Sequence, residues 1–304
     1  MRRVLVLGGH GFLGRHVVAA LDRSGYVVEV GPDRPDLDLA AAPVTRVAAM
    51  LRASRPGVVV TAAGLTTGSP TELLGHNAGV MECLVRACAL AVPGVRLVHL
   101  GSAAEYGPTP WGHDVGESDP PAPAGPYGQA KLAATRILLE ASDRGDVDGL
   151  VLRVFNPVGA GQPPSTLLGA IVRQLASAGP DADVVVGSLD AWRDFVPAVD
   201  IGTAVARAAG IRAVPERIVN LAEGRARQVR DVVNLLRDQA GHRGRLVERT
   251  GHEDAGDSAR SAAVTWQRAD VTLAARLLDW RVRCPLEVAV ADALRPMPPV
   301  EGRG

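Results

Sequence analysis

A tyrosine and a lysine stand four residues apart in the stretch GPYGQAKLAATRILLE, just after a proline-rich run. If this alanine- and leucine-rich stretch is a helix, Tyr127 and Lys131 share one face of it. A free tyrosine has a pKa of about 10, and an ammonium group roughly 4 Å away lowers that pKa by up to about 3 units at an effective dielectric constant of 20. The pair therefore indicates a proton donor tuned toward neutral pH, which acid–base chemistry on a carbonyl or an alcohol requires.

A serine in the stretch HLGSAAEYG is the second candidate for chemistry. Ser102 follows the apolar run at 95–100, which predicts a buried strand. Ligands bind at the carboxyl ends of strands in open α/β sheets, so we expect Ser102 at that crevice. Its hydroxyl could then hydrogen-bond a substrate oxygen alongside Tyr127.

A glycine-rich loop near the start of the chain predicts a dinucleotide site. In VLVLGGHGFLGRHVVAAL, Gly8, Gly11 and Gly14 follow a GxxGxxG spacing between a predicted strand and a predicted helix. The glycines permit a tight turn and a close backbone approach, and the helix N-terminus offers unpaired N–H groups to a pyrophosphate. We predict that these glycines, with Phe12 and Leu13 between them, bind the cofactor.

The end of the second predicted strand decides which dinucleotide is bound, and there the chain reads VVEVGPDRPDLDLA. Asp33 lies 19 residues past Gly14 and could accept a hydrogen bond from a ribose 2′-OH. Arg34 could instead pair with a 2′-phosphate. No acidic partner for Arg34 is evident one turn away. We therefore predict a preference for NADP(H), with NAD(H) as the alternative.

The elements that must position these residues alternate along the first half of the chain. Short β-branched runs predict strands at 3–7, 27–30, 57–61, 95–100 and 149–155, and apolar spacing predicts helices at 12–24, 44–54, 77–91 and 127–142. Strands that are apolar on both faces and joined by helices imply a parallel sheet covered on both sides. The fold class predicted is α/β, with a Rossmann-type doubly wound parallel sheet.

The pattern changes after about residue 156. Strand-like pieces at 183–187 and 217–220 lie among helical patterns at 166–177, 198–209 and 228–238, two short helices follow, and the end after about 296 reads as a loose tail. We expect residues 1–155 to form the dinucleotide-binding domain. Residues 156–304 are expected to form largely a smaller substrate-binding domain, with some segments returning to the Rossmann sheet.

Composition excludes several other classes of protein. The 304 residues carry 33 basic and 33 acidic side chains and only 3% aromatic residues, which disfavours a nucleic-acid binder. The three cysteines form no CxxC pair, and the histidines show no metal-ligand spacing. We expect no metal site and a reducing cytoplasmic location. No apolar stretch approaches the ~18 residues that a membrane helix needs.

Five stretches together resemble a known family: GGHGFLG, GSAAEYG, PYGQAK, RVFNPVGAGQ and WRDFVPAVDIGTAV. Their order and approximate spacing are similar to those of the extended short-chain dehydrogenase/reductases. These are the NAD-dependent epimerase/dehydratase-like enzymes, which act mostly on nucleotide sugars. The resemblance covers residues 1 to about 295, and it implies a Rossmann-type domain with a smaller substrate-binding domain.

The resemblance also implies roles for single residues. Tyr127 matches the family's acid/base, Lys131 the residue that lowers its pKa and holds the nicotinamide ribose, and Ser102 the group that polarises the carbonyl. The remaining matches lie along the two ligands: Asp38 and Leu39 beside the adenine, Ala62 and Ala63 along the cofactor, Asn156 at the sugar nucleotide, and Arg193 at its diphosphate.

Departures from the family pattern narrow the activity. Sugar-nucleotide 4,6-dehydratases carry an Asp-Glu pair that their chemistry needs, and Ala103 and Ala104 occupy those places. The segment after the second strand is short, as in 4-keto-sugar reductases.

The predicted function is NAD(P)H-dependent reduction of a keto group on a nucleotide-activated (deoxy)sugar. Three alternatives stay open: an NAD-dependent nucleotide-sugar epimerase, a ketoreductase for a non-sugar ketone such as a polyketide, and a non-catalytic dinucleotide-binding regulator. We also expect a homodimer, with the helices at 77–91 and 127–142 pairing across a two-fold axis.

Overall fold

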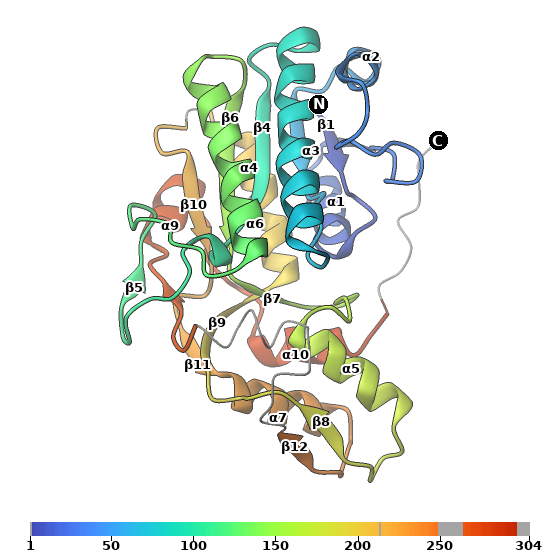
Figure 1. The fold of residues 1–304 in the computed structure, drawn as a ribbon, viewed down its shortest axis with the longest axis vertical. Coiled ribbons are helices and arrows are strands. Elements are labelled where there is room, and N and C mark those ends of the chain that lie inside the picture. The colour runs from blue at the N-terminus through green and yellow to red at the C-terminus, as the bar shows by residue number, and fades with distance from the viewer. Residues whose placement is uncertain (1, 213, 249–263, 297–304) are drawn as a thin grey trace.

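The structure is a computed structural model, and it describes residues 2–212, 214–248 and 264–296. The predicted tail after about residue 296 lies almost wholly outside the described residues. Figure 1 shows a sheet flanked by helices above and a smaller group of helices and short strands below.

The sheet has six strands in the order β10-β6-β4-β3-β1-β2, and every neighbouring pair is parallel. Its strands are β1 (Arg3–Leu7), β2 (Val27–Val30), β3 (Val58–Thr61), β4 (Arg96–Ser102), β6 (Asp148–Val154) and β10 (Ile218–Leu221). Because the strands are parallel, their carboxyl ends meet at one edge. The predicted doubly wound α/β fold is confirmed, and the strand predicted at 217–220 is β10, which returns to this sheet.

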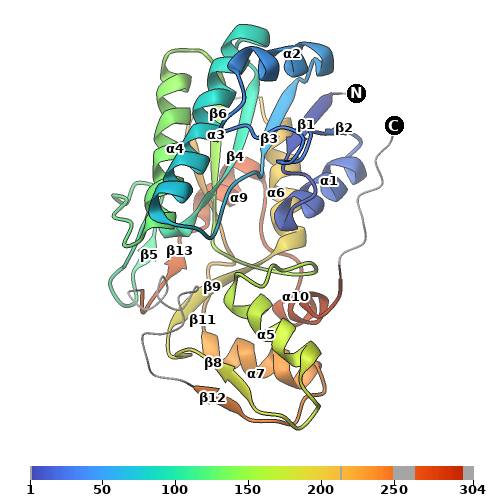
Figure 2. The same cartoon turned by 45° about the vertical axis from the view of Figure 1, so that its right-hand side comes forward.

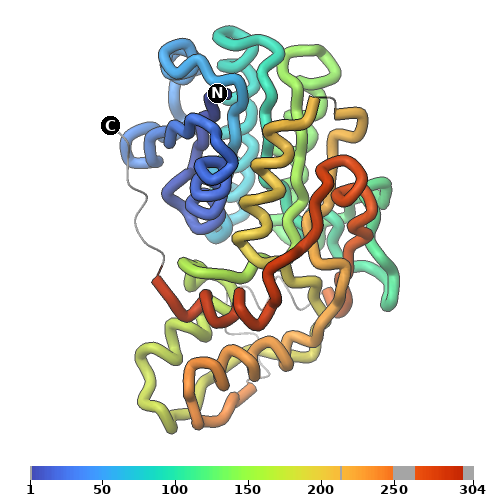
Figure 3. Tube along the Cα trace, turned by 180° about the vertical axis from the view of Figure 1, so that it is seen from behind, coloured from blue at the N-terminus to red at the C-terminus, as the bar shows by residue number. Residues whose placement is uncertain are grey.

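Helices cover both faces of the sheet. On one face lie α2 (Val44–Ser54), α3 (Pro70–Ala91) and α4 (Pro126–Asp143), of which α3 and α4 stand in front in Figure 1. On the other face lie α1 (Phe12–Arg23), α6 (Ala198–Gly210) and α9 (Thr272–Leu278), seen from behind in Figure 3. Each face has its own core of buried aliphatic side chains, so the sheet holds its edge residues in fixed positions.

One predicted boundary is wrong by a full two turns, since α3 begins at Pro70 rather than at residue 77. Ser69 caps it, because its hydroxyl accepts from the Glu72 backbone N–H while the Glu72 carboxylate accepts from the Ser69 N–H. Pro70 stands at the first helical position, where no N–H is needed. The predicted helix left out these first two turns, in the stretch GSPTELLG, because the capping box was not recognised.

The lower part of the molecule has a third core (Figure 2). A three-stranded sheet joins β7 (Asn156–Val158), β9 (Trp192–Pro197) and β11 (Ala226–Gln228), and a two-stranded one joins β8 (Val184–Val186) and β12 (Leu246–Glu248). Helices α5 (Leu167–Ser177), α7 (Val229–Gln239) and α10 (Leu286–Ala293) pack with these strands. Beside the main sheet, β5 (Asp114–Val115) pairs with β13 (Arg268–Ala269).

Candidate active site

Ser102 is the last residue of β4 and begins a single 3-10 turn, η1 (Ala103–Glu105). Its Oγ accepts from the Ala104 N–H at 3.2 Å, and its own N–H donates to Glu105 Oε1 at 2.9 Å. This reciprocal capping fixes the turn at the carboxyl edge of the sheet. The half-buried Ser102 hydroxyl is thereby held where the sequence predicted it.

Helix α4 carries the other two predicted catalytic residues and lies directly against this turn. A Cβ on Gly128 would come within 2.3 Å of the Ala104 carbonyl oxygen, so only glycine permits the contact. Tyr127 precedes this glycine in the first turn of α4, and Lys131 follows one turn later on the same face. The close approach thus brings Tyr127 to the side of the loop that holds Ser102.

Lys131 is the only lysine in the 304 residues, although the chain has 33 basic side chains. It is 5% exposed, and its Nζ donates to the Leu100 carbonyl at 2.5 Å and lies 3.2 Å from His99 Nε2. Burial lowers the pKa of Lys131 to about 8, while the negative charge of Glu105 acts in the opposite direction. A charged Lys131 lowers the pKa of a neighbouring acid–base tyrosine, and burial opposes that charge.

A buried ion pair supports the turn from below. Glu105 is fully buried, and its Oε2 accepts from Arg153 Nε on the neighbouring strand β6 at 2.9 Å. The guanidinium lies over the Tyr106 ring, 4.4 Å from its centre, and the Tyr106 hydroxyl donates to Asn220 Oδ1 at 2.7 Å. Burial raises the pKa of Tyr106 to about 12. Tyr106 therefore stays protonated and is structural.

The glycine loop has the close approaches that a dinucleotide cradle needs. Gly8 has φ +75°, and a Cβ there would meet the Ala63 N at 2.6 Å; a Cβ on Gly14 would meet the Gly8 O at 1.9 Å. Gly11 caps α1, whose first turn holds no acidic residue. The helix N-terminus is thus open to an anionic group, and the loop fits a pyrophosphate.

The other predicted cofactor residues lie around this loop. The Ala62 N–H donates to the Leu7 carbonyl at 2.9 Å, which holds the end of β3 beside the glycine loop. Leu39 is buried in the core under α2. Within α1, Leu13 packs on the opposite core, and the Phe12 ring meets the His16 ring edge-on.

The outer end of the cofactor site corrects one expectation. Arg34 was expected to lack an acidic partner, yet its Nε donates to Asp38 Oδ2 at 3.2 Å. Asp33 is paired as well, since its Oδ1 lies 2.8 Å from His10 Nδ1 in the glycine loop. Both candidates for the ribose or its 2′-phosphate therefore have an exposed hydrogen-bonding partner.

Asn156 and Arg193 line one cavity of about 110 Å³ in the lower part of the molecule. Asn156 lies two residues beyond Val154, the strand partner of Ser102, so this cavity starts at the same sheet edge. Arg193 is 6% exposed; its Nη1 donates to the Trp192 carbonyl at 2.9 Å. The other polar lining groups are Gln162, Thr166 and Ser188.

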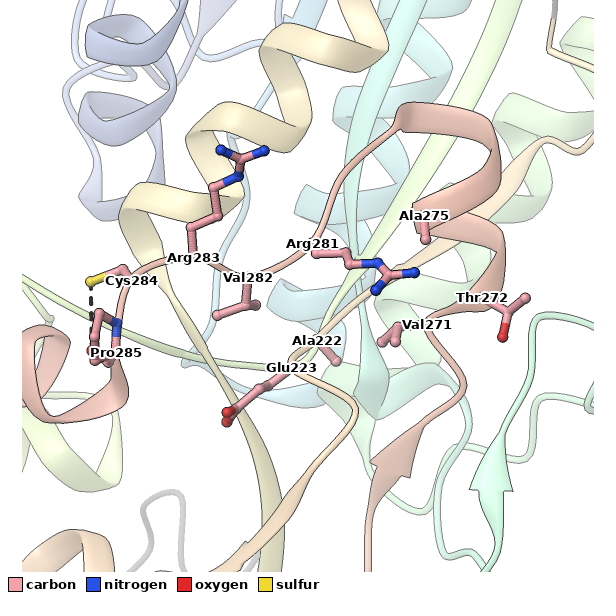
Figure 4. A pocket seen from close by; sticks show the side chains of 10 residues that line it. All are labelled: Ala222, Glu223, Val271, Thr272, Ala275, Arg281, Val282, Arg283, Cys284 and Pro285. Carbon is pink, nitrogen blue, oxygen red and sulfur yellow. Dashed lines mark hydrogen bonds between the residues drawn. The ribbon is translucent and has the colours of Figure 1, made fainter.

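Larger hollows lie elsewhere in the described part of the molecule. One, of about 550 Å³, lies between α9 and the segment leading to α10. Figure 4 shows that its charged side chains, Glu223, Arg281 and Arg283, point in different directions. A binding site needs polar groups aimed at one point, so this hollow is a poor candidate.

Sequence reasoning missed the residues that support the site from within. The S-x-x-E spacing of Ser102 and Glu105 is a capping-box signal that was readable. The ion partner of Glu105, however, is 48 residues away. The contact of His99 with Lys131 could not be predicted, because a histidine within an apolar strand gives no indication of its partner.

Comparison with known proteins places this chain in a family. Residues 4–222 match the model of the NAD dependent epimerase/dehydratase family. The chain belongs to this family, whose members related to it are NAD(P)-dependent dehydrogenases, reductases and epimerases.

Three similar proteins are informative. The chain is 37% identical over 304 aligned residues to the dTDP-6-deoxy-L-talose 4-dehydrogenase (NAD(P)(+)) of Kitasatospora kifunensis, covering 95% of this chain and 94% of that protein. It is 28% identical over 275 residues to the UDP-glucose 4-epimerase of Azospirillum brasilense, covering 79% and 78%. The structure of MoeE5 in complex with UDP-glucuronic acid and NAD superimposes with a TM-score of 0.80 at 28% identity, covering 96% and 97%.

Proposed function

We propose that this protein is an NAD(P)H-dependent reductase of a keto group on a nucleotide-activated (deoxy)sugar. The observation that carries the proposal is the pairing of two sites along one sheet edge. Ser102, Tyr127 and Lys131 lie at the carboxyl end of β4, and the cavity with Asn156 and Arg193 begins beside it. The similarity to a dTDP-6-deoxysugar 4-dehydrogenase over nearly the whole chain supports this substrate class.

In this proposal each residue has one chemical task. NAD(P)H, held at the glycine loop of Gly8, Gly11 and Gly14, would supply the hydride for the carbonyl carbon. The Tyr127 hydroxyl gives its proton to the carbonyl oxygen, and the Ser102 hydroxyl donates a hydrogen bond to that oxygen. The Lys131 ammonium favours the Tyr127 phenolate that remains. A proton from water then restores the tyrosine.

Arg193 is proposed to bind the diphosphate of the substrate. A nearly buried guanidinium on a strand is a fixed cation with a planar fork, which suits phosphate oxygens. The cavity is smaller than the ~300–1,000 Å³ of whole-ligand sites, so it takes only part of a nucleotide sugar. Arg193→Ala should remove about 1.5–3 kcal/mol of binding and raise KM about ten- to a hundredfold. An unchanged KM would indicate a ketone without a diphosphate.

One experiment separates reductase from epimerase. The purified protein is denatured and the released cofactor measured, and the native protein is then offered NADPH or NADH with a panel of keto nucleotide sugars and non-sugar ketones. A reductase releases little cofactor and consumes the reduced form, with Tyr127→Phe as the inactive control. Stoichiometric NAD release together with interconversion of two sugar epimers would contradict the proposal. The epimerase remains the second candidate because epimerases are among the relatives.

We propose NADP(H) as the preferred cofactor. Arg34 remains 56% exposed, and its surface pair with Asp38 contributes less than about 1 kcal/mol. The guanidinium is therefore able to exchange this carboxylate for a 2′-phosphate. The opposing influence is Asp33, whose negative charge repels the same phosphate.

We also propose that residues 1–155 form the dinucleotide-binding domain and residues 156–304 largely the substrate-binding domain. The separate core in the lower part supports this division, while α6 and β10 return to the main sheet.

We also propose a homodimer that forms through α3 and α4, on the basis of the resemblance to the extended short-chain dehydrogenase/reductases. Leu74 and Leu90 are exposed on α3 and offer apolar contact area. Light scattering tests this directly, and a concentration-independent monomer mass would contradict it.

The unpaired cysteine thiols favour a cytoplasmic location. Within the described ranges, no helix is long and apolar enough to cross a membrane.

A further inference from the structure

A cluster of buried polar side chains lies on the face of the sheet that α4 covers. It consists of Thr61, His99, Lys131 and Thr135, each 5% exposed or less, and is called here the buried polar cluster. Thr61 on β3 and His99 on β4 are direct strand partners. Thr135 lies one turn beyond Lys131 on α4.

The contact between His99 and Lys131 fixes the protonation of the imidazole. His99 Nε2 lies 3.2 Å from Lys131 Nζ, and both groups are buried. A protonated lysine offers only donors, so Nε2 must be the acceptor and the histidine proton must sit on Nδ1. Burial, followed by the positive charge of Lys131, keeps the pKa of His99 well below its usual range. The ring is therefore neutral at physiological pH.

We propose that His99 is a positioning residue for Lys131: its Nε2 accepts a hydrogen bond from the Lys131 ammonium and, together with the Leu100 carbonyl, holds that group protonated one helical turn from Tyr127. The kinetic effect expected from this inference rests on the proposed catalytic role of Lys131. The contact itself is independent of the substrate.

The surroundings of Lys131 explain why one acceptor matters. Glu105, on the turn after β4, is the acidic group acting on the ammonium, and its charge is shared with Arg153 from β6. Tyr127 lies on the same helix. Because Lys131 is buried, loss of the Nε2 acceptor should let it release its proton at lower pH.

The cluster also offers a matched control. Among the described residues, the Oγ1 atoms of Thr61 and Thr135 have no hydrogen-bond partner, and His99 Nδ1 approaches the Thr61 backbone without good hydrogen-bond geometry. Thr135→Val therefore alters the cluster without removing a contact to Lys131 Nζ. It keeps both shape and burial.

Because the chain has a single lysine, Lys131 can be titrated directly. Protein labelled with ¹³C at lysine Cε gives one side-chain signal, followed against pH with and without NADP⁺. In the unliganded protein, His99→Leu should lower the titration midpoint by about one to two pH units, the effect of one hydrogen bond to a charged group. His99→Gln, which keeps an acceptor, should restore most of the shift, and Thr135→Val should leave the midpoint in place. The same series in a Tyr127→Phe background reports Lys131 without its coupled neighbour.

The kinetic consequence is measured in the direction that oxidises the alcohol, where Tyr127 acts as a base. Loss of the positive charge raises the tyrosine pKa, so the rising limb of the pH–rate profile should move to higher pH in His99→Leu and back in His99→Gln. An unchanged Lys131 midpoint in His99→Leu, or no rescue by His99→Gln, overturns the proposal. If His99→Leu does not fold, ¹⁵N-histidine spectra of the wild type decide it, with the signal identified by its loss in His99→Gln. A proton found on Nε2 overturns it. Failure of the substrate assignment alone would leave the lysine titration unaffected.

Discussion

The two ends of the proposed cofactor site differ in how they hold charge. At the catalytic end, Lys131, Glu105 and Arg153 are between 0% and 5% exposed. Lys131 donates a buried hydrogen bond to the Leu100 carbonyl, and Arg153 donates one to Glu105. At the outer end, the side chains of Asp33 and Arg34 are 49% and 56% exposed; Arg34 is in a surface ion pair with Asp38, and Asp33 contacts the His10 ring.

The difference has a physical consequence for each end. A buried charge without its partner costs several kcal/mol, so the catalytic end tolerates little change. A surface pair contributes about 0–1 kcal/mol and is screened by salt, so the outer end can exchange one partner for another. Chemistry is therefore fixed at one end, whereas cofactor choice is adjustable at the other.

The largest effect should follow from breaking the buried pair. Glu105→Gln leaves the Arg153 guanidinium buried without its counter-charge, and it should reduce the free energy of unfolding by about 3–5 kcal/mol. Asp38→Asn, the matched change at the outer end, should cost less than about 1 kcal/mol. Urea unfolding of both variants measures the contrast. Similar losses for the two would remove the distinction between the ends.

A smaller effect, opposite in sign, should follow from removing the buried ammonium. The pKa of Lys131 is about 8 in the folded protein against an ordinary value of 10.5, so between these pH values the unfolded chain binds more protons than the folded one. Stability from this group therefore rises with pH across that window and is lowest below pH 8. Lys131→Met should be inactive but more stable than wild type at pH 7, by roughly 1–2 kcal/mol.

This advantage of Lys131→Met should shrink markedly by pH 10, where the folded wild-type lysine is largely neutral while the unfolded one, with its ordinary pKa of 10.5, is still partly protonated. Denaturant curves at pH 7 and pH 10 test it. A variant that is less stable than wild type at both pH values would show that the hydrogen bond to Leu100 outweighs the cost of burial.

The smallest effect should come from the outer end. Arg34→Ala removes one charge-assisted contact to a 2′-phosphate while releasing Asp38 from a weak pair, so NADPH affinity should fall about tenfold and NADH affinity should hardly change. Fluorescence titrations with both cofactors at low and moderate salt provide the measurement. Equal losses for NADPH and NADH would assign the 2′ position to another group, with Asp33 as the first to examine.

The features that could be predicted from the sequence depend on residues close together in the chain, and most of those that could not depend on residues far apart in it. The main strands and the shared face of Tyr127 and Lys131 were readable because hydrophobic period and residue spacing are local properties. The small sheet of β7, β9 and β11 was not, because these segments contain proline, charged or amide residues in place of the continuous β-branched runs of the main strands.

The side-chain pairings were harder to predict for a physical reason. Arg34 and Asp38 are four apart in a loop with two prolines, where helical spacing gives no expectation of contact. Glu105 meets Arg153 only because β4 and β6 are neighbours in the sheet. Such partners depend on topology, which the local pattern does not specify.

The single lysine leaves this chain with one side-chain amine that acylating reagents can modify. Acylating metabolites, activated esters and bifunctional crosslinkers all attack neutral lysine amines, and the one lysine here is 5% exposed. Its lowered pKa makes that amine intrinsically reactive near pH 8, while burial withholds it from reagents. The rate of acylation at Lys131 would therefore record how often the catalytic crevice opens to solvent, with no background from other lysine side chains.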